Sequence, residues 1–451
     1  MKQPLSRTTI TLCLCALLFT AQAARAQSGN AAQPEKAQAT PLSTDERAAK
    51  ALYEEAETYV SRKFEQFNRN RIPYSKEREA RTYTEQRELA ERNAATLSAR
   101  KNLAGEDLFY LGMLYRLAED DDKALVALKS YLDAKPPAGS ENAQTARVEF
   151  ITIAAAKGML EEAEGRRKEL LNNQPLRPSS RLLVAVILAN SYREAKKLDP
   201  ALERAAEAFE LLKSLKTETQ AERTARIDAV KTISGLLVQL YLQKDRQKEA
   251  RAVVEDLREL SLSFPSPALY RQSERLFASL GVEEASVKSD KAAALEARPL
   301  PPEIKATEWI DQKPVKLSDL RGQVVLLDFW APWCGPCIST FPTLRDWHQK
   351  YKDKGLVILG LTNYFGEAEG QEMKPEEELD YYRRFKKKFR LPYGIGIEDG
   401  SENDLNYGIA SIPTTFLIDR RGRVRFISLG ASQDEAQEIE ATIKRLLDEK
   451  Q

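Results

Sequence analysis

Histidine is almost absent from this chain, since His348 is the only one among 451 residues. A metal site built from several histidines is therefore excluded, and we assign no catalytic role to His348, which lies among polar neighbours. Net charge is nearly absent too, because 69 Lys and Arg residues face 68 Asp and Glu residues. A chain without a strong charge of either sign offers no field for nucleic acid, so we expect no nucleic-acid partner.

Long hydrophobic runs are also lacking. The apolar stretch at residues 10–21 is shorter than the roughly 20 residues that a membrane-spanning helix needs. It follows the cations Lys2 and Arg7 and precedes Ala-Arg-Ala at residues 24–26, a small-residue cleavage pattern. We predict a signal peptide over residues 1–26, cleaved on export to a periplasmic or other extracytoplasmic space, rather than a membrane anchor.

Cysteine is scarce, and its few positions are informative. Cys13 and Cys15 lie inside the predicted signal peptide, so the exported protein keeps only Cys334 and Cys337. A tetrahedral zinc site needs four ligands, which two cysteines and one distant histidine do not supply. In an oxidising compartment, a lone Cys-x-x-Cys pair is more often catalytic than structural. We therefore expect a redox-active disulfide and neither a metal nor another cofactor.

The length of the chain exceeds one ordinary hydrophobic core, so we expect two folded domains. Residues 27–45 are rich in Ala, Gln, Pro and Ser and are interpreted as a flexible linker. Residues 46–282 have a helical composition and periodicity. Residues 283–302 form a second linker, charged at first and then proline-rich. Residues 303–451 alternate strands with helices, which predicts an α/β domain.

The helical region contains an internal repeat. Ala124, Ala163, Ala201 and Ala250 occupy one position of four degenerate repeats, and Gly112 marks a second position in the first of them. Small residues at such positions let paired antiparallel helices approach closely. The pattern resembles tetratricopeptide (TPR) modules, and that resemblance implies a protein partner bound by this domain. An irregular helical bundle remains the alternative.

The α/β region contains one strand that is apolar along most of its length, at residues 324–330, followed directly by the two cysteines. A helix is predicted after them at residues 338–351. The remaining elements expected here are a short hairpin at 309–317, a buried strand at 356–362, a charged helix at 375–390, an edge-like strand at 393–397, a hairpin of strands 414–419 and 424–429, and a closing helix at 432–450.

A Cys-x-x-Cys delivered by a strand to the start of a helix is suited to disulfide exchange. The free N–H groups and dipole of the helix stabilise a thiolate on Cys334, the expected nucleophile. Cys337, one turn further, is the expected resolving cysteine. Asp328 lies within the apolar strand, where burial should raise its pKa, so that its neutral carboxyl could exchange a proton with Cys337.

Three blocks of sequence resemble the extracytoplasmic TlpA/ResA-like branch of the thioredoxin family. They are Lys316–Gly322, the strand with Trp333-Cys334-Gly335-Pro336-Cys337, and Pro413–Gly422. The fold class implied is an all-α TPR-like repeat domain followed by an α/β thioredoxin-like domain with a central mixed sheet. The resemblance also implies a proton-relay role for Asp328 and a cis bond before Pro413.

By the same resemblance, the protein is a thiol–disulfide oxidoreductase acting on exported protein clients, in settings such as cytochrome c maturation or the rescue of wrongly oxidised proteins. The surface that meets the client is implied to comprise Trp333, Gly335, Pro336, Ile412 and Pro413. The dipeptide between the cysteines carries no charge, which favours a reductant. A reductant outside the cytoplasm would need a membrane electron donor of the DsbD/CcdA type.

Two alternatives remain open at this stage. A peroxidase of the peroxiredoxin type would carry Thr three residues before its reactive cysteine, where this chain has Ala331. The chain could also be chiefly a TPR scaffold, with the helical domain as the working part and the redox domain as an accessory.

Overall fold

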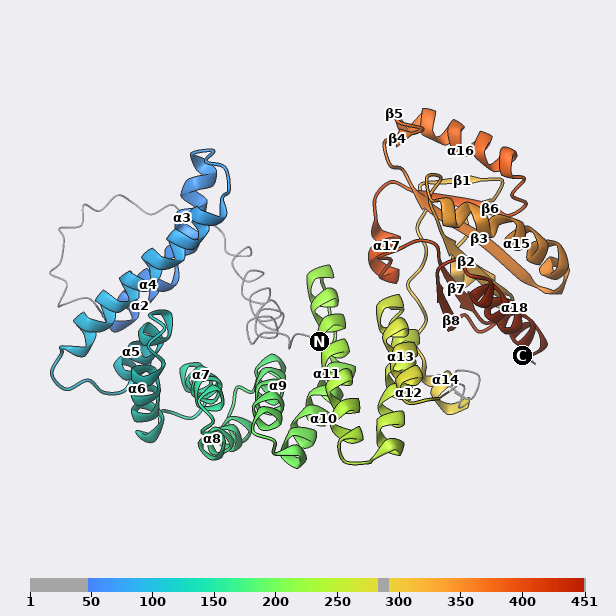
Figure 1. The fold of residues 1–451 in the computed structure, drawn as a ribbon. Coiled ribbons are helices and arrows are strands. Elements are labelled where there is room, and N and C mark those ends of the chain that lie inside the picture. Colours follow the sequence, from blue (N-terminus) through green and yellow to red (C-terminus); the bar gives the residue numbers. More distant parts are fainter. Residues whose placement is uncertain (1–47, 283–291, 450–451) are drawn as a thin grey trace. The chain divides into compact units, whose positions relative to one another are not determined.

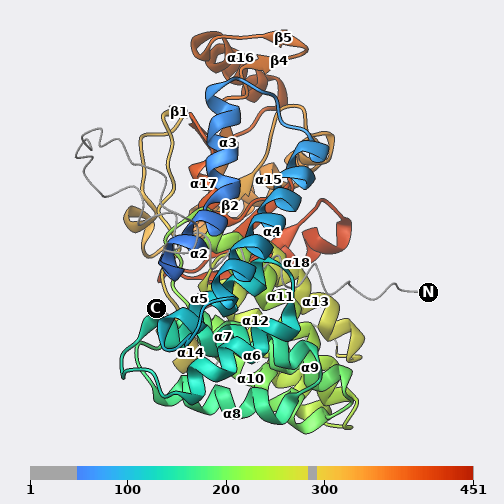
Figure 2. The ribbon, with the colours of Figure 1, turned by 90° about the vertical axis from the view of Figure 1, so that its left-hand side faces the viewer.

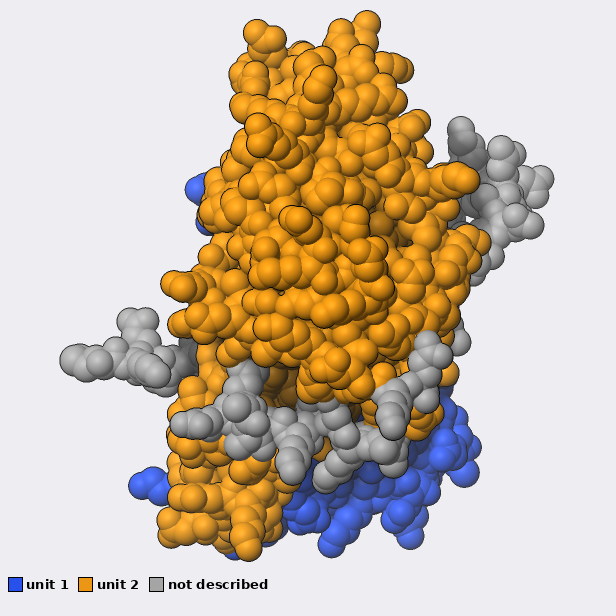
Figure 3. All heavy atoms as spheres, turned by 90° about the vertical axis from the view of Figure 1, so that its right-hand side faces the viewer, with its two compact units in different colours: residues 1–214 blue, residues 215–451 orange. Residues whose placement is uncertain are grey.

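The computed structural model describes residues 48–282 and 292–449. The predicted signal peptide, the first linker and residues 283–291 of the second linker lie outside these described residues. The chain divides into two compact units after Ser214, coloured separately in Figure 3. In the described ranges, no helix combines the length and the apolar character that crossing a bilayer requires.

The first unit is entirely helical over its described residues (Figure 1). Several of its helices begin at a side chain that accepts a hydrogen bond from a backbone N–H of the first turn, as Ser75 and Ser140 do. Its helices are α2 (Ala49–Glu57), α3 (Tyr59–Arg69), α4 (Lys76–Ser98), α5 (Glu106–Leu117), α6 (Asp121–Asp133), α7 (Glu141–Ala156), α8 (Leu160–Asn172), α9 (Pro178–Glu194) and α10 (Leu198–Ser214).

Consecutive helices of this unit pack in pairs, α5 with α6, α7 with α8 and α9 with α10 (Figures 1 and 2). Gly112 permits a close approach of α5 and α6, because a Cβ atom there would lie 2.7 Å from Cγ of Leu128. Ala124, Ala163 and Ala201 are fully buried between helices. These contacts fit the predicted TPR-like pattern, which itself stays a prediction.

The second unit contains a six-stranded mixed sheet with strand order β1-β6-β3-β2-β7-β8. The central strands β2, β3 and β6 are parallel, and β1, β7 and β8 pair antiparallel to their neighbours. The strands are β1 (Glu308–Ile310), β2 (Val324–Phe329), β3 (Leu356–Asn363), β6 (Gly394–Glu398), β7 (Thr414–Ile418) and β8 (Val424–Leu429), and a separate two-stranded hairpin is formed by β4 (Glu367–Ala368) and β5 (Gln371–Glu372).

Helices cover both faces of this sheet, and the alternation of side chains along β2 shows the two cores. Leu326 faces one core together with side chains of α15, α16 and α18. Leu327 and Phe329 face the other, which includes residues of α12, α13 and α17. The helices of the unit are α11 (Gln220–Leu242), α12 (Gln247–Ser263), α13 (Pro267–Ser279), α14 (Ala292–Ala297), α15 (Gly335–Tyr351), α16 (Pro375–Phe389), α17 (Glu402–Tyr407) and α18 (Gln433–Asp448).

The last helices of the predicted helical domain therefore belong, by their contacts, with the sheet. The ring of Tyr270 in α13 lies 5.9 Å from that of Phe426 in β8, centroid to centroid. Arg298 is almost completely buried and donates to both carboxylate oxygens of Glu259 in α12, at 2.8 and 2.6 Å, and also to the carbonyl of Val424. Compact packing thus divides the chain at residue 214, whereas the predicted domain boundary was at residue 282.

The fold class predicted from sequence is confirmed, with helices first and a thioredoxin-like mixed sheet after them. Two local expectations were wrong. Residues 309–317 do not form a hairpin, because β1 pairs with β6 instead. For the same reason, the strand around Ile395 is not an edge strand, since it lies between β1 and β3.

Candidate active site

The two cysteines lie where β2 ends and α15 begins. The strand β2 lies in the middle of the sheet, between β3 and β7, and all six of its residues are buried. Cys334 is the N-cap residue of α15, and its sulfur accepts a hydrogen bond from the backbone N–H of Cys337 at 3.2 Å. The positive end of the helix dipole and the free N–H groups of the first turn therefore meet at Cys334.

Cys334 and Cys337 are joined by a disulfide, with their Cα atoms 5.2 Å apart. Cys337 is fully buried, whereas Cys334 is 5% exposed. The sequence led us to expect an exposed Cys334, and in this oxidised form it is largely covered. The disulfide explains the low exposure of Cys334, because it holds the sulfur of Cys334 next to the sulfur of the buried Cys337. Cys334 remains the more accessible of the two.

Asp328 lies on β2, opposite Gly360 of β3 and Thr415 of β7. It is 1% exposed, and its Oδ2 has no hydrogen-bond partner among the described residues. Burial raises the pKa of Asp328 to about 7, while a hydrogen bond from the Thr415 side chain acts in the opposite direction. A carboxyl with this pKa can take up or release a proton near neutral pH.

The loop before β7 lies beside the cysteine-bearing segment. Thr414 is paired with Phe329, so continuing this antiparallel register places Pro413 and Ile412 alongside the two residues that follow β2. The Ile412–Pro413 peptide bond is cis. Pro413 is buried, and Ile412 is half-buried and packs against both cores.

The predicted client-facing residues differ in exposure. Trp333 is 64% exposed, and Gly335 and Pro336 are exposed as well. The structure adds Phe365, which the sequence analysis missed and which lies against Trp333 with ring centroids 5.6 Å apart. One feature of the sequence could have revealed that Phe365 lies near the cysteines. Phe365 follows the end of β3, and neighbouring parallel strands end at the same edge of a sheet.

A second missed residue is Tyr393, whose ring lies near Asp328. Gly360, opposite Asp328, makes room for Trp330, because a Cβ atom there would lie 2.9 Å from its Nε1, and the ring of Tyr393 lies at contact distance, 3.5 Å from the same point. Burial, and then the charge of Asp328, raises the pKa of Tyr393 well above its ordinary value. Tyr393 therefore stays neutral beside Asp328 and contributes a phenolic hydroxyl to its surroundings.

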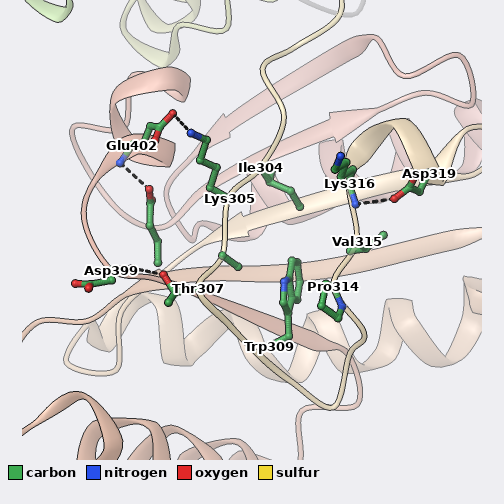
Figure 4. A pocket seen from close by; sticks show the side chains of 12 residues that line it. Ile304, Lys305, Thr307, Trp309, Pro314, Val315, Lys316, Asp319, Asp399 and Glu402 are labelled. Atoms are coloured by element: carbon green, nitrogen blue, oxygen red, sulfur yellow. Dashed lines mark hydrogen bonds and ion pairs between the residues drawn. The ribbon is translucent and has the colours of Figure 1, made fainter.

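A separate hollow of about 490 Å³, shown in Figure 4, opens beside β1. Its polar groups bind one another: the backbone N–H of Asp399 donates to Thr307, and that of Lys316 donates to Asp319. Neither Cys334 nor Cys337 lines it. Within the described ranges, no three Cys, His, Asp or Glu side chains gather as the ligands of a metal ion would.

Residues 299–427 match the model of the AhpC/TSA family. The chain is 33% identical over 116 residues to the thiol-disulfide oxidoreductase ResA of Bacillus thuringiensis subsp. konkukian, covering 26% of this chain and 60% of that protein. It is 30% identical over 138 residues to the protein of the same name from Bacillus anthracis, covering 30% of this chain and 71% of that protein. The chain thus spans about 60% of the length of the first of these curated relatives.

Among solved structures, the chain is similar to one from Chlorobium tepidum described as a thiol:disulfide interchange protein DsbE. The identity is 29%, the match covers 33% of this chain and 95% of that chain, and the TM-score is 0.28.

The mixed sheet and the disulfide at the start of α15 define the class: a thioredoxin-fold protein with a Cys-x-x-Cys centre. Within that class, the C-terminal domain places the chain in the family of the ResA thiol-disulfide oxidoreductases, to which it belongs.

Proposed function

We propose that this protein reduces disulfides of exported protein clients through the Cys334/Cys337 dithiol. The observation that carries the proposal is the disulfide at the N-terminus of α15, with one sulfur in the core and the other at its edge. Such a pair can cycle between dithiol and disulfide without rearrangement of the fold, because both cysteines belong to one helical turn.

The reaction begins from the reduced form. The Cys334 thiolate attacks one sulfur of the client disulfide, forming a mixed disulfide and releasing the other client sulfur as a thiolate. Cys337 then loses its proton and attacks the sulfur of Cys334, which releases the second client thiolate and restores the internal disulfide. Two electrons have passed from the protein to the client, and a donor must return them.

Asp328 is proposed as the acceptor of the Cys337 proton. It lies on the same face of β2 as Leu326, which belongs to the core cluster that contains Cys337. With a pKa of about 7, its carboxylate is a strong enough base to take the proton of a buried thiol and weak enough to return it. Ile412 is proposed to pair with the client backbone beside the disulfide.

The proposal also covers the location of the protein, the direction of electron transfer and the electron donor. The signal-like segment at residues 1–26 supports an extracytoplasmic location, and Gly335 and Pro336 support a reductant because neither stabilises the thiolate further. Electrons would come from a membrane donor of the DsbD/CcdA type. Mass determination of the protein from the cell envelope tests the location: cleavage after Ala26 gives a chain that begins at Gln27.

Trapping of the mixed disulfide tests the exchange scheme. In the Cys337→Ala variant, clients should accumulate as disulfide-linked adducts of Cys334 that dithiothreitol releases, and the Cys334→Ala variant should form none. The scheme is wrong if no adduct accumulates while the wild-type protein reduces the same client. Equilibration with dithiothreitol buffers tests the direction: a reduction potential near −270 mV, about that of thioredoxin, supports a reductase, and one near −120 mV, about that of DsbA, supports an oxidant.

The helical domain is proposed to bind a protein partner. The support is the pairing of α5 to α10 through fully buried small residues such as Ala124 and Ala163, as TPR modules pair their helices. A partner captured equally by the wild-type protein and by the Cys334→Ala variant would support a binding role that is independent of the redox site. Capture that requires Cys334 would assign the partner to the redox site instead.

A further inference from the structure

Two aromatic side chains project into solvent beside the redox disulfide. Trp333, the residue before Cys334, is 64% exposed, and Phe365 is 37% exposed. Their rings meet edge to face, with an interplanar angle of 72°. Large aromatic side chains normally gain by leaving water, so an exposed pair at a reactive centre points to a surface that another molecule covers.

The fold holds Phe365 in this position. The carboxylate of Glu378 in α16, which is 1% exposed, accepts the backbone N–H of Phe365 at 2.9 Å and that of Gly366 at 3.0 Å. The hydroxyl of Tyr382 donates to the carbonyl of Asn363 at 2.8 Å. Phe365 is thus fixed from behind by buried groups, and its exposed ring is a consequence of that anchoring.

The hairpin that follows Phe365 places two carboxylates opposite each other, which is electrostatically unfavourable. Glu367 of β4 lies directly opposite Glu372 of β5, and both are exposed. Like charges facing each other across an antiparallel pair destabilise it. A cation from another molecule placed between them would remove that cost, so the hairpin is suited to a basic partner.

We propose that Trp333 and Phe365 form a docking platform for one large apolar side chain of the client, next to the client cysteine, and that Glu367 and Glu372 attract Lys or Arg residues flanking it. This specificity rests on the proposed disulfide exchange. The geometry of that reaction brings the client to this place, because attack by Cys334 puts the client sulfur on the residue that follows Trp333. The substrate class is therefore extended polypeptide with an apolar and basic sequence around its cysteine.

The test uses the Phe365→Ala variant of the full-length reduced protein and three disulfides. The first is a peptide with an internal disulfide and a Phe beside one cysteine, flanked by Arg. The second has Ser in place of that Phe, and the third is hydroxyethyl disulfide, which has no side chains to dock. For the Phe peptide we expect the second-order rate constant of its reduction to fall about fivefold, the scale of one aromatic contact, with little change for the other two.

The matched control is Leu405→Ala, which removes a side chain of similar exposure, 39%, from α17. It should leave the rates of all three disulfides unchanged. The platform is refuted if the ratio of Phe-peptide to Ser-peptide rates is the same in the wild type and the Phe365→Ala variant. The proposed function itself fails in a different way, namely if the reduced wild type does not react even with hydroxyethyl disulfide.

The charge component has its own measurement. Replacing both Glu367 and Glu372 with Gln should abolish the preference for an Arg-flanked over a Glu-flanked Phe peptide, while the preference for Phe over Ser persists. High salt should have the same effect on the wild type, since it screens exposed charges. A preference for Arg that survives both changes would remove the hairpin from the proposal.

Discussion

Replacing Asp328 with Asn should stabilise the thioredoxin-fold domain at neutral and alkaline pH but not in acid. The reason is the cost of a buried charge. Burial raises the pKa of Asp328 from 3.8 to about 7. Below pH 3.8 the carboxyl is protonated in both the folded and the unfolded chain, so it does not affect their balance. Between pH 3.8 and 7 the carboxyl of Asp328 is ionised in the unfolded chain but still mostly protonated in the folded one. The free energy of unfolding therefore falls as the pH rises through this range.

The size of the effect follows from the shift. A difference between 3.8 and about 7 is about 3 pH units, and at about 1.36 kcal/mol per unit the ionised group destabilises the fold by about 4 kcal/mol above pH 7. Asparagine has the same shape, still offers an oxygen to the Thr415 hydroxyl and never ionises. The variant should therefore be more stable than the wild type by up to about 4 kcal/mol at pH 8, and similar to it at pH 4.

Urea unfolding of the oxidised full-length protein, followed by tryptophan fluorescence, measures this difference. All four tryptophans lie between residues 309 and 347, so the signal reports on the thioredoxin-fold domain alone. The control is Asp346→Asn, an exposed carboxylate paired with Lys350, which should change stability by less than about 1 kcal/mol at either pH. A difference between Asp328→Asn and wild type that stays constant from pH 4 to pH 8 would refute the reasoning.

Three further substitutions test single hydrogen-bonding and packing contacts of the fold. Glu378→Gln weakens the two backbone hydrogen bonds behind Phe365, so we expect a loss of about 2 kcal/mol in fluorescence-detected unfolding and faster proteolysis within residues 364–374. Gly112→Ala places a methyl group against Leu128 and should cost about 1–3 kcal/mol, seen by circular dichroism but not by tryptophan fluorescence. Arg298→Met removes the donors to Glu259 and to the strand, and should cost about 2 kcal/mol by fluorescence.

The parts of the site that the sequence predicted are those determined by local pattern. The apolar run at residues 324–330 and the helix after it identified the central strand and α15, which the structure confirms. A carboxylate inside that run was predicted to be buried, and Asp328 is. Cys334 was placed correctly at the helix start, but its 5% exposure depends on the disulfide bond and on surrounding packing, which spacing does not reveal.

The parts that the sequence did not predict depend on contacts between distant segments. The strand at residues 393–397 has the short length of an edge strand, and only its pairing with β1, some 85 residues earlier, makes it internal. The surroundings of Asp328 likewise required Gly360 and Tyr393, which lie on β3 and just before β6. A glycine in a strand is typical of a close approach, but it does not identify the side chains that use the space.

The contacts of α12 and α13 with the sheet lead to a prediction about where the chain can be divided. Tyr270 and Leu262 belong to the same core as Leu327 and Phe329 of β2, so a fragment beginning at residue 303 would expose this apolar face to water. A fragment beginning at residue 215 keeps the covering helices. We expect the longer fragment to unfold at the same urea concentration as the full chain, judged by tryptophan fluorescence, and the shorter one to unfold earlier or aggregate. Equal midpoints for both fragments would show that the sheet does not need these helices for its stability. The domain that begins at residue 303, as expected from the sequence, would then be stable by itself.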